Sequence, residues 1–233
     1  MMIKINRGEI FYTDGGAGRT VVLLHGNGEE HTLFDGVCEK LRRDCRVIAV
    51  DSPGHGKSFA LKKYDYYEMA DGVAGLITAL SLERPVLFGF SDGGILGLII
   101  AYKYPGMLSG LIAAGANLNP RGVKATPRFL LGVSNFFKPD PLLGLMLRGP
   151  DIKGAELAGI KIPVLITAGG KDLIKEKHTK KIAESIPGAE LRILRGETHS
   201  SYVKDAERLY DLIENFLEAN IFLEQVTPTR NDE

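Results

Sequence analysis

Residues 85–94 have the sequence PVLFGFSDGG, an apolar stretch that leads directly into a turn of small and polar residues. A short apolar run of this kind predicts a strand that is buried on both faces. Gly89-Phe90-Ser91-Asp92-Gly93 matches the pattern G-x-S-x-G, and the apolar residues after it predict a helix. Between a strand and a helix, this pattern predicts a sharp turn that exposes the hydroxyl of Ser91 as a nucleophile. The alternative is a Gly-Ser turn that only caps the helix.

Similar apolar runs occur on both sides of this stretch and alternate with segments of helical spacing. After a predicted hairpin in residues 2–13, the runs are 21–24, 46–50, 108–114, 163–168 and 189–194. The helical segments are 33–41, 67–80, 95–104, 176–186 and 202–217. Buried strands that alternate with helices predict an α/β fold, with a mostly parallel sheet and helices on both faces, in a single domain of residues 1–233.

The composition excludes several classes of protein. The 233 residues include 29 Lys and Arg against 29 Asp and Glu, so the formal net charge is zero. Without an excess of positive charge we expect no nucleic acid partner and no membrane partner. The two cysteines, Cys38 and Cys45, do not form a disulfide framework. The first residues contain no apolar run typical of a signal peptide, so we expect a cytoplasmic protein.

Residues 117–160 interrupt the alternation of strands and helices with several prolines and many apolar side chains. A loop of this length without structure of its own is unusual, so we predict a small helical lid inserted between two strands. We expect an apolar roof over short or aromatic acyl groups, formed by Phe129, Phe136, Phe137, Leu142, Leu145 and Met146. The alternative is a surface elaboration. The tail after Asn220 is expected to be frayed.

A serine nucleophile needs a base, and the base in turn needs an acid. Of the five histidines, His199 is the one that follows the last predicted strand and precedes the last helix. Asp172 follows the strand at 163–168, so that Ser91, Asp172 and His199 occur in the chain order that a triad on such a sheet requires. Asp140 and Asp151 are rival acids within the predicted lid. We expect them to be solvated.

Two backbone amides are expected to stabilise the oxyanion of a tetrahedral intermediate. Asp92 supplies the first, because it directly follows the nucleophile. The glycines of His25-Gly26-Asn27-Gly28 allow the chain to curl so that the amide of Asn27 supplies the second. The side chains of Asn27 and Asp92 are also expected to contact substrate. An ordinary glycine turn at 25–28 is the alternative.

Five motifs together resemble the α/β-hydrolase fold superfamily over almost the whole chain. They are HGNG at 25–28, DSPGHGKS at 51–58, GFSDGG at 89–94, GGKD at 169–172 and THS at 198–200. The resemblance implies an eight-stranded, mainly parallel sheet, a cap between strands six and seven, and triad roles for Ser91, Asp172 and His199. GFSDGG is also similar to the segment of valacyclovir hydrolase-like esterases in which the aspartate holds a substrate ammonium group. The alternative for Asp92 is that it bonds to local backbone donors.

These features predict a serine hydrolase of the carboxylesterase type that cleaves a small ester through an acyl-enzyme. The chemistry requires neither a cofactor nor a metal. Cleavage of an amide, a thioester or a carbon-carbon bond, and perhydrolysis, use the same triad and stay open. A ligand-binding protein that has lost catalysis is the alternative from another class. The sequence does not indicate an oligomeric state.

Overall fold

The computed structural model describes residues 1–220, so the expectation for the tail after Asn220 lies outside the described residues. Within this range the chain forms an eight-stranded sheet with the order β1-β2-β4-β3-β5-β6-β7-β8. The strands are β1 (Met2–Ile5), β2 (Gly8–Gly15), β3 (Arg19–Leu24), β4 (Cys45–Val50), β5 (Val86–Phe90), β6 (Gly110–Ala114), β7 (Val164–Gly169) and β8 (Glu190–Leu194). β1 pairs with β2 and β2 with β4 in antiparallel fashion, and the other pairs are parallel. The predicted sheet is therefore confirmed.

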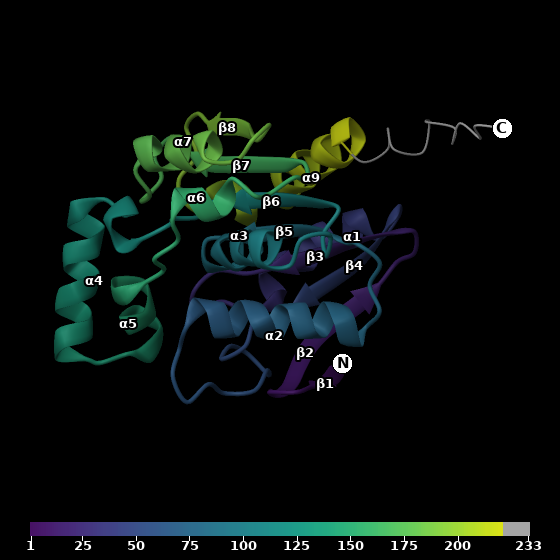
Figure 1. The fold of residues 1–233 in the computed structure, drawn as a ribbon, viewed down its shortest axis with the longest axis horizontal. Helices are drawn as coiled ribbons and strands as arrows, with labels where there is room; N and C mark the ends of the chain where they lie inside the picture. Colours follow the sequence, from purple (N-terminus) through teal and green to yellow (C-terminus); the bar gives the residue numbers. More distant parts are fainter. Residues whose placement is uncertain (221–233) are drawn as a thin grey trace.

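Helices cover both faces of the sheet and enclose two apolar cores (Figure 1). The main helices are α1 (Asp35–Leu41), α2 (Tyr66–Ala79), α3 (Asp92–Lys103), α7 (Glu176–Glu184), α8 (Ser201–Lys204) and α9 (Ala206–Asn220). One core lies between the sheet and α2, α3 and α7, and the other lies between the sheet and α1, α8 and α9. No helix within residues 1–220 is long and apolar enough to cross a bilayer.

The last predicted helix, residues 202–217, is in fact two helices that meet at Asp205. Asp205 has an extended backbone, with φ −86° and ψ 107°. Its side chain accepts hydrogen bonds from the N–H groups of Glu207 (3.1 Å) and Arg208 (3.2 Å). These donors begin the first turn of α9 and have no partner within that helix, so a capping aspartate ends one helix and starts the next.

The segment of residues 117–160, called the insert below, is helical and lies between β6 and β7 in the chain. It contains a 3₁₀ turn (Pro120–Gly122), α4 (Ala125–Phe137), α5 (Pro141–Arg148) and α6 (Gly154–Leu157). Asp140 caps α5 by accepting from the N–H groups of Leu142 (2.7 Å) and Leu143 (3.2 Å). Figure 1 shows α4 and α5 at one end of the molecule, to one side of the sheet.

The turn between β5 and α3 brings the start of α3 against the end of β3. The N–H of Gly93 donates to the carbonyl of His25 at 3.1 Å. A Cβ atom on Gly93 would lie 2.2 Å from the carbonyl oxygen of Leu24 and 2.8 Å from that of His25. Both contacts are with backbone, which cannot move aside without shifting β3. Glycine is therefore required at this position.

Replacing Gly93 with alanine is expected to destabilise the protein by about 3 kcal/mol, at the upper end of the usual range for overpacking a core. Gly132→Ala is the matched control, because nothing lies within 4 Å of a Cβ at this position in α4. That variant is expected to gain about 0.5 to 1 kcal/mol from helix propensity. Urea unfolding followed by circular dichroism measures both. Equal stability of the two variants would contradict the close approach of α3 to β3.

Candidate active site

Ser91 lies at the turn between β5 and α3 with a strained backbone. Its φ is 51° and its ψ is −112°, a region that residues other than glycine rarely adopt. The turn is held on both sides, because the N–H of Ser91 donates to Ala114 at 2.7 Å and its carbonyl accepts from Ile95 at 3.1 Å. Such outliers cluster at functional sites, where the surrounding structure maintains the strain. The predicted sharp turn is thus present.

A continuous chain of hydrogen bonds connects Ser91, His199 and Asp172. His199 Nδ1 lies 2.7 Å from Asp172 Oδ1, and His199 Nε2 lies 3.1 Å from Ser91 Oγ. A carboxylate only accepts, so Nδ1 carries the proton and Nε2 presents its lone pair to the serine hydroxyl. The remaining lone pairs of Asp172 accept from the N–H groups of Ile174 (2.8 Å) and Gly169 (3.2 Å). Asp172 is buried, whereas 19% of the His199 side chain is exposed.

Two residues that the sequence did not single out shape the space around the imidazole. Gly115 follows β6 with φ 64°, and a Cβ there would lie 2.8 Å from Cε1 of His199. The ring of Phe90 packs against the imidazole with 5.0 Å between ring centroids. The signal for Gly115 in the sequence is only its place directly after a predicted strand. Its role depends on a neighbour 84 positions later in the chain.

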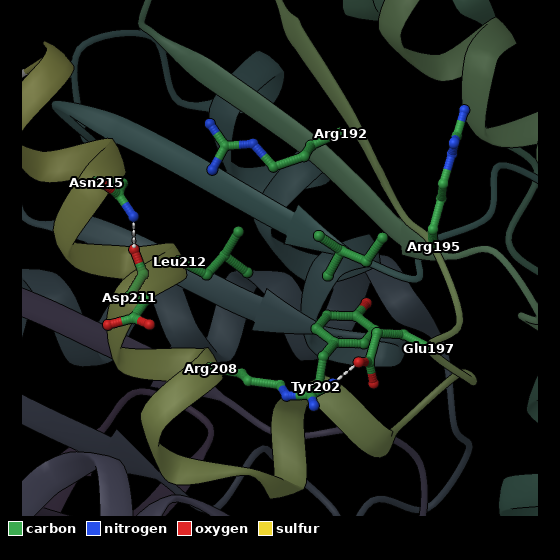
Figure 2. A pocket seen from close by; sticks show the side chains of 9 residues that line it. Arg192, Arg195, Glu197, Tyr202, Arg208, Asp211, Leu212 and Asn215 are labelled. Atoms are coloured by element: carbon green, nitrogen blue, oxygen red, sulfur yellow. Dashed lines mark hydrogen bonds and ion pairs between the residues drawn. The ribbon is translucent and has the colours of Figure 1, made fainter.

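The loop that carries His199 is held by its own hydrogen bonds. Ser201 Oγ donates to Glu197 at 2.6 Å and accepts from the N–H of Thr198 at 2.8 Å. Glu197 also pairs with Arg208 on α9. Figure 2 shows these two residues at the edge of a cavity of about 290 Å³ between β8 and α9. Among the described residues, the lining of this cavity does not include Ser91, Asp172 or His199.

The loop of residues 25–28, called the oxyanion loop below, is held from behind by a buried histidine. His25 Nε2 accepts from the N–H of Ser52 at 3.0 Å, and its Nδ1 donates to the carbonyl of Gly26 at 2.8 Å. The carboxylate of Glu29 accepts from the N–H of Gly26 at 3.0 Å. Within residues 1–220, the N–H groups of Asn27 and Asp92 have no hydrogen-bond acceptor. Both predicted oxyanion donors are therefore free to bind a ligand.

The side chains of Asn27 and Asp92 bond to each other rather than to the local backbone. Asn27 Nδ2 donates to Asp92 Oδ2 at 2.8 Å, and the hydroxyl of Tyr66 donates to Asp92 Oδ1 at 2.9 Å. Burial raises the pKa of Asp92, and the two donated hydrogen bonds oppose this rise. Tyr66 was not singled out in the sequence, because nothing in its local pattern indicates a contact with Asp92.

The insert contacts the oxyanion loop through α5, where the carbonyl of Leu142 accepts from Asn27 Nδ2 at 3.3 Å. On α4, by contrast, Phe129 is 69% exposed, and Phe136 and Phe137 are each 80% exposed. These three phenylalanines are exposed to solvent here, and the apolar roof over an acyl group stays a prediction. Met146 on α5 is half-buried.

The two rival acids, and two of the other histidines, have hydrogen-bond or ion-pair partners of their own. Asp140 caps α5, and Asp151 is exposed and pairs with Lys153 at 2.6 Å. His31 lies 2.6 Å from the buried Asp51. His178 accepts from the N–H of Leu118 at 2.9 Å. Hydrogen bonds within the fold account for each of these four side chains.

A sequence profile described as alpha/beta hydrolase fold matches residues 19–145, more than half of the chain. The chain therefore belongs to the alpha/beta hydrolase fold family. The fold, the strained serine and the hydrogen-bonded histidine described above are in keeping with this membership.

The relatives of this chain include hydrolases of known reaction type. An AB hydrolase superfamily protein, YisY, of Bacillus subtilis is 29% identical over 89% of this chain and 94% of its own length. A pimeloyl-[acyl-carrier protein] methyl ester esterase of Neisseria meningitidis is 26% identical over 88% of this chain and 95% of its own. Among solved structures, a thermophilic esterase from Thermogutta terrifontis is 25% identical, with a TM-score of 0.76 over 94% of this chain and 98% of its own. These similarities support a hydrolase.

His25 predicts how stability depends on pH. Burial lowers the pKa of its imidazole from 6.5 to about 4. Folded His25 is therefore neutral between these values, whereas the unfolded chain takes up a proton below pH 6.5. Its contribution to stability is complete above pH 6.5 and is lost as the pH falls towards 4.

The difference in unfolding free energy between wild type and His25→Gln is expected to shrink by on the order of 2 to 3 kcal/mol from pH 7.5 to pH 4.5. Urea unfolding of both proteins at the two pH values gives this difference, in which the other titrating groups cancel. A difference that is constant or grows towards pH 4.5 would show that His25 is not held neutral.

Proposed function

We propose that this protein is a serine hydrolase of the carboxylesterase type that cleaves small esters through an acyl-enzyme. The hydrogen-bond chain from Asp172 through His199 to Ser91, at 2.7 and 3.1 Å, carries this proposal. Two relatives named as esterases, one of them acting on a methyl ester, support the choice of an ester as substrate.

In the first half of the proposed reaction, Ser91 Oγ attacks the ester carbonyl carbon while its proton passes to His199 Nε2. The free N–H groups of Asn27 and Asp92 stabilise the oxyanion that forms. The intermediate collapses by breaking the bond to the alcohol oxygen, which takes the proton from Nε2 and leaves. The acyl group stays on Ser91.

In the second half, water attacks the acyl carbon and gives its proton to His199 Nε2. Collapse of the second tetrahedral intermediate releases the carboxylic acid and returns the proton to Ser91 Oγ. Asp172 stays ionised, keeps the proton on Nδ1 and stabilises the imidazolium in both halves. Every step uses protein groups and water.

The substrate contacts are also part of the proposal. Asn27 and Asp92 lie beside the nucleophile, and α5, with Met146, is the part of the insert nearest to them. Because Phe129, Phe136 and Phe137 face solvent, we assign the acyl-side wall to α5 rather than to α4. Short or aromatic acyl groups remain the expected substrates.

Ser91→Ala is expected to lower kcat/KM for p-nitrophenyl acetate by at least about 10⁴-fold, because the alanine cannot form the acyl-enzyme. A fluorophosphonate probe is expected to add to wild type at Ser91 in a one-to-one ratio and to leave Ser91→Ala unlabelled. Intact-mass and peptide mass spectrometry give the site. Full ester hydrolysis by the alanine variant, or labelling of another residue, would refute the proposed nucleophile.

Asp172→Asn is expected to lower kcat by about 10⁴-fold with the fold retained, because the amide favours the wrong tautomer of His199. Asp151→Asn is the matched control. Asp151 is exposed, and its ion-pair partner within residues 1–220 is Lys153, so the activity of Asp151→Asn should match that of wild type. Steady-state kinetics on one ester, with thermal melts of all three proteins, make the comparison. If Asp172→Asn is as active as the control, a different acid serves the histidine.

A further inference from the structure

The carboxyl group of Asp92 is buried beside the proposed nucleophile. It lies next to the nucleophile in sequence, at the first position of α3, yet only 3% of the residue is exposed. Each oxygen accepts a hydrogen bond from a different segment of the chain, Oδ2 from Asn27 and Oδ1 from Tyr66. The N-terminus of a twelve-residue helix also favours a negative charge here. Together these features hold a carboxylate in place.

Asn27 is the residue that this carboxylate immobilises. Its side-chain nitrogen has two hydrogens, and these bond to Asp92 Oδ2 at 2.8 Å and to the carbonyl of Leu142 at 3.3 Å. The side chain therefore has no N–H left for an oxyanion, and only its backbone N–H is free. The two bonds instead tie the middle of the oxyanion loop to the start of α3 and to the first turn of α5.

We propose that Asp92 is a positioning residue whose carboxylate holds Asn27, so that the two N–H donors of the oxyanion hole keep a fixed separation and the insert stays docked on the oxyanion loop. Tyr66 holds the carboxylate from the other side. This inference rests on the proposed function, because it assigns a role in the same reaction. Asp92 thus acts twice, through its own backbone N–H and through the residue that its side chain orients.

The same geometry argues against an ammonium-binding role for Asp92. Asp92 is only 3% exposed, and both of its carboxylate oxygens already accept hydrogen bonds, from Asn27 and from Tyr66. An ammonium group that took the place of Asn27 at this carboxylate would release the loop of residues 25–28 from the start of α3. A positioning role requires no such rearrangement.

The first experiment compares wild type and Asp92→Asn on two substrates, the benzyl ester of valine and benzyl 3-methylbutanoate, which lacks only the amino group. The amide at position 92 has one acceptor oxygen in place of two, so it can no longer accept from both Asn27 and Tyr66. We expect kcat to fall by about tenfold to a hundredfold on both substrates, with KM changed less than about threefold. A loss confined to the valine ester, or no loss on either ester, would overturn the inference.

The second experiment measures the Kd of phenylboronic acid, which forms a tetrahedral adduct on a nucleophilic serine. A purely structural role of Asp92 would leave this Kd unchanged. The Kd is expected to rise by the same factor by which kcat falls. A fall in kcat with an unchanged boronate Kd would also overturn the inference.

Asn27→Ala tests the same contact from the exposed side of the pair, and it serves if Asp92→Asn does not fold. We expect a similar fall in kcat, and a double variant no worse than the more damaged single variant, because both substitutions remove one interaction. Fully additive losses would contradict the inference.

Tyr66→Phe and Tyr64→Phe form a matched pair. Tyr66 donates to Asp92, whereas the hydroxyl of the nearby Tyr64 donates to the carbonyl of Gly54 at 3.0 Å. Only Tyr66→Phe is expected to lower kcat, by about threefold to tenfold. Ser91→Ala, measured alongside, separates the positioning role from the proposed serine hydrolase. If Ser91→Ala is inactive while Asp92→Asn and Asn27→Ala match wild type, the positioning role is wrong and the proposed hydrolase is retained.

Discussion

The positive φ of Ser91 is the constraint on which the rest of the site depends. It turns the chain from β5 into α3 within one residue, so that the hydroxyl and the N–H of the next residue lie at the same point. This turn needs room, and Gly93 provides it by letting α3 approach the carbonyl oxygens of Leu24 and His25. The strain is maintained because hydrogen bonds to Ala114 and Ile95 fix both sides of the serine.

Parallel strands end at one edge of the sheet, which explains how side chains far apart in the chain meet at this serine. Asp172 follows β7 and His199 follows β8, and each lies in a loop closed by hydrogen bonds of its own. The carboxylate of Asp172 receives two backbone N–H bonds besides the imidazole, and these bonds fix its orientation. The site is thus orientated before any substrate binds.

A second polar network begins at Asp92, the residue after Ser91, and joins four separate segments. It runs from Tyr66 at the start of α2 through Asp92 and Asn27 to the carbonyl of Leu142 on α5. Such a network lies where the protein has low dielectric, so each of its hydrogen bonds is strong and each loss is costly. Through Leu142, α5 rather than the exposed α4 is the part of the insert that bonds to Asn27.

The sequence by itself determined the order of strands and helices, the helical insert and the chain order of Ser91, Asp172 and His199, because apolar periodicity and strand-end motifs are local signals. Only the tertiary structure decided which distant groups meet. Tyr66 reaches Asp92, Gly115 makes room for His199, and the side chain of Asn27 donates to Asp92. The phenylalanines of α4 are another case that the sequence did not decide. Their apolar spacing indicates a helix face but not what that face contacts. Burial and hydrogen-bond partners depend on how the insert packs on the sheet, and no local pattern contains that information.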